Sequence, residues 1–268
     1  ASGTQVGVYA LENPDGGTPV WTNATNGSAN NLLMGNVVCT ANGNGGLTYD
    51  PAKMYKESAK YSFFGYYPYS TTIIAPATGQ SPKLACTFQT TPSDQVDYMY
   101  ATPLENQGPS DNAQVLKFNH ALTQVTVKLI NGTKKKLTLN SLTIDAPGSA
   151  TLDISNGTWS SPGASATYHL YGPAAGEEIA ANASYLVKGQ LMLLPVGSGG
   201  TAYTFDMSVT EEGSVATEKK GLTLTLPSGG MKAGYSYEYT ITYGASSIQL
   251  STSVTEWQYV SGPGITVK

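Results

Sequence analysis

The sequence predicts an all-β protein made of two tandem β-sandwich domains. Apolar and polar side chains alternate with a period of two in many short segments, for example along Val125, Val127 and Leu129. This period places the apolar side chains on one face of a strand. Helical periodicity is nearly absent, and Gly, Pro, Asn and Ser break the chain into strand-length pieces. Short strands separated by turn residues are typical of sandwiches and barrels.

The composition is that of a folded protein with a mild negative charge. The chain has 268 residues, of which 40% are hydrophobic and 12% charged, so it can bury the core of one large β domain or of two ordinary ones. The formal net charge is −4, and lysines 134–136 form the one basic cluster, which argues against a nucleic-acid partner. Every basic residue is lysine, so the chain offers no bidentate arginine and no site for an arginine-specific protease.

In the first half, alternation and turn residues predict a series of short strands. They span residues 5–11, 36–41, 61–67, 84–89, 96–101, 115–118 and 122–130. A long loop or loose hairpin follows the first strand, with Trp21 as its anchor. Residues 50–57 predict the only helix, because Asp50 suits the N-cap and Pro51 the first helical position.

In the second half, the predicted strands span residues 137–144, 168–171, 186–194, 201–209, 221–226 and 235–243, with a short edge piece at Trp159. Along the first of these, the apolar pattern changes phase. Leu137 and Leu139 share one face, whereas Leu142 and Ile144 have the opposite parity. A β-bulge at Asn140 and its neighbour would return all four side chains to the core.

A polar, glycine-containing break at residues 131–136 predicts the domain boundary. The N-terminal domain is expected at residues 1–131, and the C-terminal domain with its tail at residues 132–268. Each half has enough predicted strands for a sandwich of ordinary size. We therefore expect two separately folded sandwiches with a limited interface.

No motif in the sequence predicts an enzyme. His120 lacks an evident nucleophile and orienting carboxylate, and we expect a half-buried structural histidine bonded to the backbone at a strand turn. His120 and His169 have no metal-ligand spacing. The acidic residues are scattered, and only the fold can bring two of them together as a glycosidase requires. We expect no catalytic residue, no metal and no cofactor.

The cysteines and tyrosines each leave two interpretations open. Cys39 and Cys86 both fall on predicted strands of the first half, so a disulfide and a pair of buried free thiols are both compatible with the sequence. The 18 tyrosines suit strands as packing residues, while a minority can line a groove that binds a sugar. A glycan- or host-ligand-binding module is accordingly the alternative to a purely structural protein.

An ordered set of motifs resembles the fimbrillin-like proteins of Bacteroidales, the FimA-type subunits of type V pili. The motifs are Gln5-Val6-Gly7-Val8-Tyr9-Ala10, Phe64-Gly65-Tyr66-Tyr67-Pro68-Tyr69, Asp97-Tyr98-Met99-Tyr100-Ala101, Phe118-x-His120-Ala121-Leu122-x-x-Val125-x-Val127, and Ala233-Gly234-Tyr235-x-Tyr237-x-Tyr239 with Trp257 downstream. They span almost the whole chain. The resemblance implies two sandwiches of transthyretin-like topology with Greek-key connections, and a fimbrial subunit used in cell adhesion.

The resemblance also implies a route of export and assembly. A lipoprotein leader with its lipid cysteine would lie upstream of Ala1 and anchor the precursor to the outer membrane. A protease would then remove the first strand of the N-terminal domain, and a neighbouring subunit would fill the exposed groove with its C-terminal strand. The implied partners are other pilus subunits, with host glycans or proteins as adhesion ligands. The implied location is extracellular, on the cell-surface fimbrium.

The tail at residues 246–267 is the predicted polymerising element. The strand at residues 235–243 already offers a last strand for the second domain, and the tail adds a further pair of strand-length segments. Its candidate inward side chains are Ile248, Leu250, Val254, Trp257, Ile265 and Val267. The alternative is that residues 247–260 form the edge hairpin of their own sheet, which would leave only residues 265–267 free to exchange.

Overall fold

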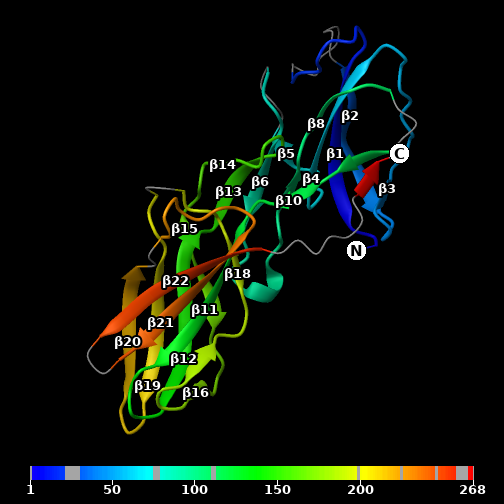
Figure 1. The fold of residues 1–268 in the computed structure, drawn as a ribbon. Helices are drawn as coiled ribbons and strands as arrows, with labels where there is room; N and C mark the ends of the chain where they lie inside the picture. Colours follow the sequence, from blue (N-terminus) through cyan, green and yellow to red (C-terminus); the bar gives the residue numbers. More distant parts are fainter. Residues whose placement is uncertain are drawn as a thin grey trace.

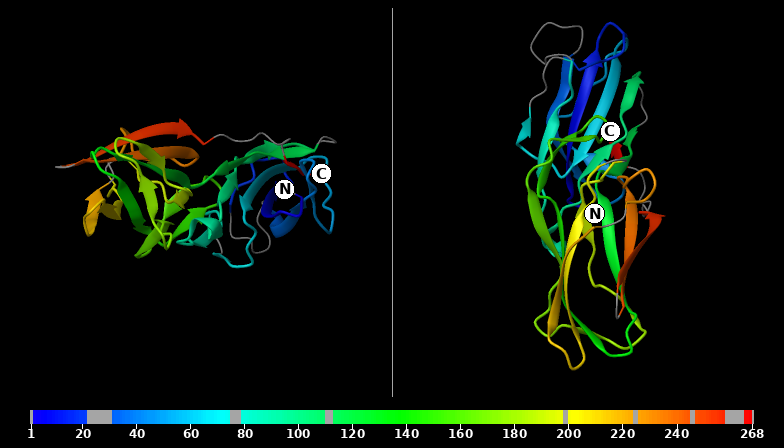
Figure 2. Two further views of the ribbon diagram at one scale, coloured as in Figure 1. Left: turned by 90° about the horizontal axis from the view of Figure 1, so that it is seen from below. Right: turned by 90° about the vertical axis from the view of Figure 1, so that its left-hand side faces the viewer.

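The computed structural model describes residues 2–21, 31–74, 79–109, 113–197, 200–223, 226–244, 247–257 and 265–267. Figure 1 shows an elongated molecule with an N-terminal and a C-terminal lobe. Four sheets build the two lobes, and the single one-turn 3₁₀ helix of the described residues is η1 (Pro92–Asp94). The chain is therefore all-β, as predicted. In the views of Figure 2, both chain ends lie in the N-terminal lobe.

The N-terminal lobe is a curled nine-stranded sheet. Its strands are β1 (Gln5–Asn13), β2 (Asn31–Ala41), β3 (Gly46–Thr48), β4 (Lys60–Tyr67), β7 (Met99–Ala101), β8 (Leu104–Gln107), β9 (Gln114–Leu116), β10 (Phe118–His120) and β23 (Ile265–Val267). The order is β10-β7-β4-β1-β2-β3-β23-β9, with β8 also beside β4. β9 and β10 stand at opposite ends of this order although only Lys117 separates them, so the sheet must curve back on itself.

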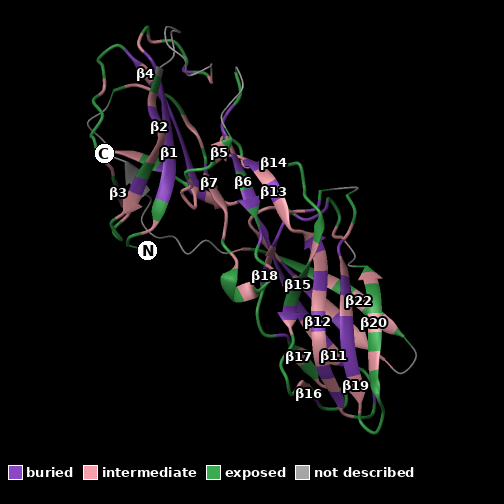
Figure 3. Ribbon diagram, turned by 180° about the vertical axis from the view of Figure 1, so that it is seen from behind, coloured by how far each residue is buried: buried purple, intermediate pink, exposed green. Residues whose placement is uncertain are grey.

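The central strands of this sheet bury both of their faces. Val8 of β1 and Phe63 of β4 point into the core inside the curled sheet. Tyr9 and Phe64, the next residues along, belong to the second core cluster on the outer face. Because neighbouring side chains alternate between faces, both strands read as nearly continuous apolar runs. They appear as buried ribbons in Figure 3.

The C-terminal lobe is a sandwich of two five-stranded sheets. One contains β11 (Thr123–Asn131), β17 (Ser184–Leu186), β18 (Leu191–Leu193), β21 (Tyr235–Tyr243) and β22 (Ile248–Glu256). The other contains β12 (Leu137–Pro147), β15 (Ser165–Tyr171), β16 (Glu177–Ile179), β19 (Thr204–Glu211) and β20 (Ala216–Thr223). Val127 and Tyr239 from the first sheet and Leu139 and Phe205 from the second share one buried cluster.

The bulge predicted in β12 is confirmed. The register between β12 and β19 shifts between Leu139 and Ser141, which leaves Asn140 as the extra residue. Leu137, Leu139, Leu142 and Ile144 are all buried. The predicted strand at residues 221–226 is shifted, because β20 covers Ala216–Thr223 and Leu224 lies outside the described residues.

A small fourth sheet joins the two lobes. It consists of β5 (Ile73–Ile74), β6 (Lys83–Thr87), β13 (Ser149–Asp153) and β14 (Trp159–Ser160) in the order β14-β13-β6-β5. β6 precedes the predicted boundary and β13 follows it, yet they pair along five residues from Ser149↔Thr87 to Asp153↔Lys83. The buried cluster of the C-terminal sandwich continues through Leu84 and Cys86 to Tyr66. The interface between the lobes is thus a shared sheet and core.

The strand partners also differ from the predicted boundary at Asn131. β11 pairs in parallel with β21 from Gln124↔Ser236 to Asn131↔Tyr243 and antiparallel with β17 and β18. It therefore lies wholly in the C-terminal sandwich. Strand pairing changes from one lobe to the other before Thr123, because β10 still belongs to the nine-stranded sheet.

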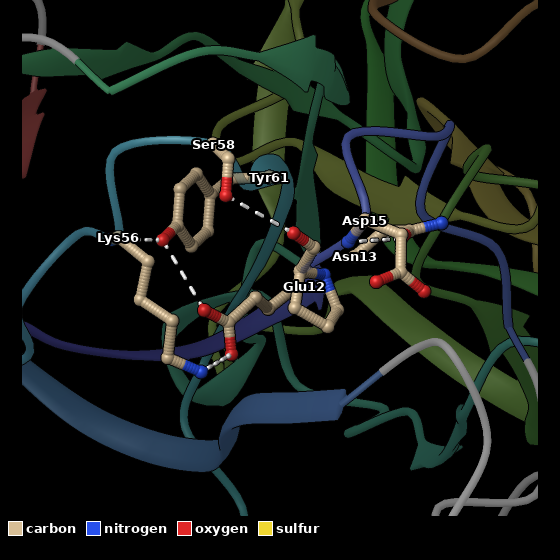
Figure 4. Close-up of polar contacts among 7 residues, drawn as sticks. Glu12, Asn13, Asp15, Lys56, Ser58 and Tyr61 are labelled. Atoms are coloured by element: carbon tan, nitrogen blue, oxygen red, sulfur yellow. Dashed lines mark hydrogen bonds and ion pairs between the residues drawn. The ribbon is translucent and has the colours of Figure 1, made fainter.

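The helix predicted at residues 50–57 is wrong, because the segment is irregular. Tertiary contacts outweigh the local helix signal here, since the Tyr55 ring packs on Tyr61 with centroids 4.7 Å apart. Lys56 Nζ lies 3.0 Å from Glu12 Oε2, and Tyr61 Oη donates to Glu12 Oε1 at 3.3 Å (Figure 4). Glu12 is only 2% exposed, so these contacts satisfy a buried carboxylate. Burial raises the pKa of Tyr61.

Candidate functional site

The C-terminal segment begins as an ordinary hairpin of its own sheet. β22 pairs with β21 over nine residues, from Tyr235↔Glu256 to Tyr243↔Ile248. Ile248 and Leu250 are partly buried against the sandwich core, whereas Val254 is 44% exposed. Three of the predicted donor side chains are therefore held in the sheet of their own lobe.

Trp257 marks the point where the chain leaves this hairpin. Its backbone N–H donates to the carbonyl of Gly234 at 2.9 Å. Its indole ring stacks on the His120 imidazole, with centroids 4.0 Å apart and planes 7° from parallel. The stack ties the end of this hairpin to β10 of the nine-stranded sheet.

His120 is in turn held by a carboxylate. Its Nδ1 lies 2.6 Å from Asp97 Oδ2, in place of the expected bond to the backbone. The strand register explains this pair. His120 faces Met99 in the β10–β7 register, and Asp97 lies two residues before Met99. Long-range strand register has to be known before the two residues can be matched.

The surroundings of His120 do not form a catalytic arrangement. A cavity of about 280 Å³ adjoins the His120–Trp257 stack, and its other linings include Tyr100, Lys117 and Glu256. Among the described residues that line it there is no Ser, Thr or Cys, so none of them forms a Ser–His or Cys–His pair with the imidazole there. His169, on β15, faces Thr143 in the β12–β15 register.

The C-terminal end of the chain completes the N-terminal sheet. β23 lies between two N-terminal strands, parallel to β3 through Thr266↔Gly46 and Val267↔Leu47. On its other side it is antiparallel to β9, from Ile265↔Leu116 to Val267↔Gln114. Figure 1 shows β23 beside β3, far from the hairpin that precedes it. The side chains of Ile265 and Val267 lie outside the described residues, as do residues 258–264.

The position of β23 defines a slot in the N-terminal sheet. Without β23, the facing edges of β3 and β9 would present unpaired backbone donors and acceptors, a ready template for an extended strand. Leu47 and Leu116 on the flanking strands are buried, at 5% and 1% exposure. The slot therefore combines backbone hydrogen bonds with apolar neighbours, which are the two requirements for strand addition.

Cys39 and Cys86 are both free and buried, so the second of the two sequence-based alternatives holds. Cys39 belongs to the core inside the curled sheet and Cys86 to the cluster shared by the lobes. Burial raises the pKa of each thiol to about 12, which keeps both thiols protonated and unreactive near neutral pH.

The part of the chain that the structure describes has neither a metal centre nor a membrane-spanning helix. No group of three or more His, Cys, Asp or Glu side chains there is arranged to hold a metal ion. Within the same residues, no helix is long and apolar enough to cross a membrane.

The fold and the slot define a structural class of protein, an all-β chain in which a terminal strand completes a distant sheet. The fimbrillin-like family profile matches residues 1–257. The chain therefore belongs to the fimbrillin-like family. This family comprises structural adhesion proteins, so the expectation that the chain is not an enzyme is confirmed.

Solved structures share the fold at low sequence identity. A fimbrial protein from Bacteroides vulgatus superimposes with a TM-score of 0.72 and 17% identity, over 94% of this chain and 93% of that chain. A protein from Parabacteroides distasonis, described as a candidate cell adhesion protein, gives a TM-score of 0.58 and 9% identity over 97% and 90% of the two chains. A similarly described protein from Bacteroides uniformis gives 0.54 and 20% over 96% and 93%. No curated protein matches the chain.

Proposed function

We propose that the chain is a subunit of a type V pilus that polymerises by donor-strand exchange. The C-terminal strand β23 is the donor, and the slot between β3 and β9 is the acceptor. In the isolated subunit the strand fills the slot of its own chain. In the filament it fills the slot of a neighbour, and the neighbours are further copies of this chain or other pilus subunits.

The single observation that carries this proposal is the pairing of β23 with two N-terminal strands at once. The backbone ladder supplies affinity, and alternate side chains supply register. The same hydrogen bonds form whether the strand comes from the same chain or from another. Exchange therefore replaces an intramolecular contact by an equivalent intermolecular one, at little change in contact energy.

The donor is confined to the last part of the predicted tail. Ile248, Leu250 and Val254 lie on β22, which pairs with β21 over nine residues. Releasing β22 would break that ladder and expose core-packed side chains, whereas releasing β23 disturbs only a three-residue strand. We assign the donor role to Ile265 and Val267, and Trp257 is the fixed root of the exchanging segment.

Family membership suggests the remaining steps of the life cycle. We propose that each lobe has transthyretin-like topology, and that the two lobes are domains that divide before Thr123. We also propose export as a lipoprotein precursor, removal of an upstream strand by a protease, and adhesion as the role of the finished fimbrium at the cell surface. Metabolic labelling of the precursor with a fatty acid tests its lipidation. A change in its size on a gel after secretion tests the proteolytic step.

Deletion of residues 261–268 tests the donor assignment. The truncated subunit keeps β22 and the whole C-terminal sandwich, so it should remain folded but fail to enter filaments in cells that lack another copy of the gene. Electron microscopy of the cells, with circular dichroism of the purified subunit, gives both readouts. Filaments of normal length built from the folded, truncated subunit would overturn the assignment.

A matched pair of point variants tests the backbone pairing of β23 without shortening the chain. Thr266→Pro removes the backbone N–H of the central residue of β23, whereas Thr266→Ser keeps it. The Pro variant should abolish assembly and the Ser variant should preserve it. Equal assembly by the two variants would show that β23 does not pair in the filament.

A further inference from the structure

A polar cavity at the junction of the lobes lies apart from the slot and from Trp257. It has a volume of about 350 Å³ and is lined by Trp21, by residues before and at the start of β6, and by the end of β13 and the residues after it. This volume is at the small end of the range of about 300 to 1,000 Å³ that ligand pockets occupy. The cavity thus suits a ligand the size of one sugar ring.

Trp21 supplies an aromatic wall held in place by packing. Its ring makes an edge contact with Tyr9, at 5.7 Å and 68°, and a tilted contact with Phe64, at 4.8 Å and 46°. Both partners belong to the buried core cluster. Trp21 also lines the cavity, so an aromatic residue whose ring is restrained by packing borders the space open to a ligand.

Asp153 supplies a fixed hydrogen-bond acceptor. Its Oδ1 accepts bonds from Ser81 Oγ at 2.5 Å, from Ser155 Oγ at 2.7 Å and from the Ser155 backbone N–H at 2.9 Å. These three bonds hold the carboxylate in one orientation. Its other oxygen, Oδ2, accepts none of the hydrogen bonds found among the described residues, so it remains available to a ligand hydroxyl.

Lys83 supplies a donor next to that carboxylate. It stands directly opposite Asp153 in the β6–β13 register, where opposite charges ordinarily pair. Yet no ion pair joins the two among the described residues, and both line the cavity. The Lys83 ammonium and the Asp153 carboxylate can therefore both interact with a ligand in the cavity.

The amides at the rim complete the set of polar groups. Asn156 Oδ1 accepts from the Thr158 backbone N–H at 2.8 Å and from Thr158 Oγ1 at 2.7 Å, which leaves its Nδ2 as the free donor. Gln80 is exposed and also lines the cavity. Donors and an acceptor thus surround a cavity that has one aromatic wall.

We propose that this cavity binds one neutral hexopyranose unit of a glycan. A pyranose presents C–H groups to an aromatic face and hydroxyls, each both donor and acceptor, around its rim, which matches the linings. The charges of Asp153 and Lys83 offset each other, so the lining has no net charge that would favour an anion, and its polar groups disfavour an apolar ligand. The site gives the protein a direct adhesive function that does not depend on strand exchange.

The test uses the isolated, full-length subunit and the methyl glycosides of galactose, glucose and mannose as probes. Saturation-transfer NMR and titration of the tryptophan fluorescence report binding. At least one hexoside should bind, and Asp153→Asn should weaken its affinity about tenfold, the factor expected for one hydrogen bond to a charged group. The Asn side chain retains one oxygen for Ser81 and Ser155 but replaces the free acceptor by a donor.

Asp145→Asn is the matched control. Asp145 is a carboxylate of β12 that also accepts a hydroxyl bond, from Thr167 Oγ1 at 2.6 Å, but it does not line the cavity. This variant should bind the hexoside like the unmodified subunit. If Asp153→Asn fails to fold, Gln80→Ala at the exposed rim takes its place and should weaken binding several-fold.

Three results would overturn the proposal. They are the absence of binding by all three hexosides, equal affinity of Asp153→Asn and the unmodified subunit, and equal losses in Asp153→Asn and Asp145→Asn. The same titration with N-acetylneuraminic acid tests the charge of the ligand, and binding of this acidic sugar alone would overturn the neutral-sugar assignment. None of these results bears on filament assembly, so this inference and the donor-strand proposal fail separately.

Discussion

At the scale of single residues, the buried carboxylate of Glu12 should be sensitive to mutation of its partner Lys56. Lys56→Met removes the ammonium that lies 3.0 Å from it and leaves a charge at 2% exposure with Tyr61 as its remaining side-chain donor. We expect the free energy of unfolding to fall by about 1 to 3 kcal/mol, the cost of leaving a buried polar group short of a partner. Urea denaturation measures it.

Lys136→Met is the control for that variant. Its ammonium lies 2.7 Å from Glu178, but both side chains are largely exposed, so the pair contributes little. We expect a clear loss of stability for Lys56→Met and almost none for Lys136→Met. Similar losses of stability in the two variants would mean that the Glu12–Lys56 pair contributes no more than an exposed ion pair.

The stack of Trp257 on His120 makes a second prediction at this scale. Trp257→Ala should loosen the root of the exchanging segment, so backbone amides of β3 and β9 should exchange hydrogen faster by about two- to tenfold, as expected for loss of one aromatic pair. Trp257→Phe keeps a ring against His120 and should exchange close to normally. Unchanged exchange in the Ala variant would show that the stack does not control β23.

At the scale of elements, the β12 bulge implies that one residue of this strand can be deleted at a small cost in stability. Leu139, Ser141 and Leu142 face Val209, Ser208 and Met207 in order, so removing Asn140 turns β12 into a regular strand with the same partners. The variant loses the Asn140 bonds to Ser208 and Thr210, which should cost about 1 kcal/mol. Chemical denaturation of the deletion variant measures this.

Deletion of Thr143 is the matched comparison. It moves Ile144 and Ala146, both buried, to the opposite face of β12, and a one-residue slip of this kind exposes a whole apolar set. This variant should lose several kcal/mol or fail to fold, since a single buried Ile truncation already costs about 2 to 5 kcal/mol. Equal damage from the two deletions would contradict the assigned register.

The elements also show which parts of the fold local sequence can predict. Alternation predicted β11 and β21, because a strand with one buried face has apolar residues at every second position, whereas β1 and β4 were recognised as short apolar runs bounded by turn residues. The same logic predicted the bulge from the parity of four apolar residues. The helix at residues 50–57 failed because contacts of Tyr55 and Lys56 with distant residues outweigh local propensity.

Local sequence patterns did not predict which distant strands pair. The β6–β13 pair, the placement of β11 and the partner of His120 all depend on register between segments far apart in the chain. The candidate donor residues were all in the predicted tail, but the alternation of apolar residues did not distinguish Ile248 from Ile265 as a donor side chain. Only the pairing of β22 with β21 and of β23 with β3 separates them.

At the scale of the whole molecule, a single buried cluster connects the two lobes. Tyr168 and Tyr239 belong to it and Tyr98 packs against it, and burial raises the pKa of all three tyrosines to about 12. In the unfolded chain a tyrosine loses its proton near pH 10. Above about pH 10 the folded state therefore holds more protons than the unfolded state, and stability falls as the pH rises towards about 12.

The corresponding experiment is urea denaturation at a series of alkaline pH values, with tyrosinate absorbance followed in parallel. Unfolding should become steadily easier above about pH 10, and tyrosinate should appear together with the loss of structure rather than before it. A free energy of unfolding that stays constant through about pH 11 would contradict the burial of these hydroxyls.

The central claim is that β23 moves from its own slot to that of a neighbour. A disulfide between Thr266→Cys and Val115→Cys reports this directly, because the two residues face each other across the β23–β9 pair and opposed side chains in such a pair lie about 4.5 to 5.5 Å apart. Val115 is 48% exposed, so oxidant reaches the site, while buried Cys39 and Cys86 stay protonated.

The oxidised double variant is compared as isolated subunit and as filament on a non-reducing gel. We expect a monomer with an internal disulfide from the isolated subunit, and a ladder of covalently linked subunits from filaments. Filaments that dissolve into internally bonded monomers would show that β23 never leaves its own sheet, and would contradict donor-strand exchange by this segment.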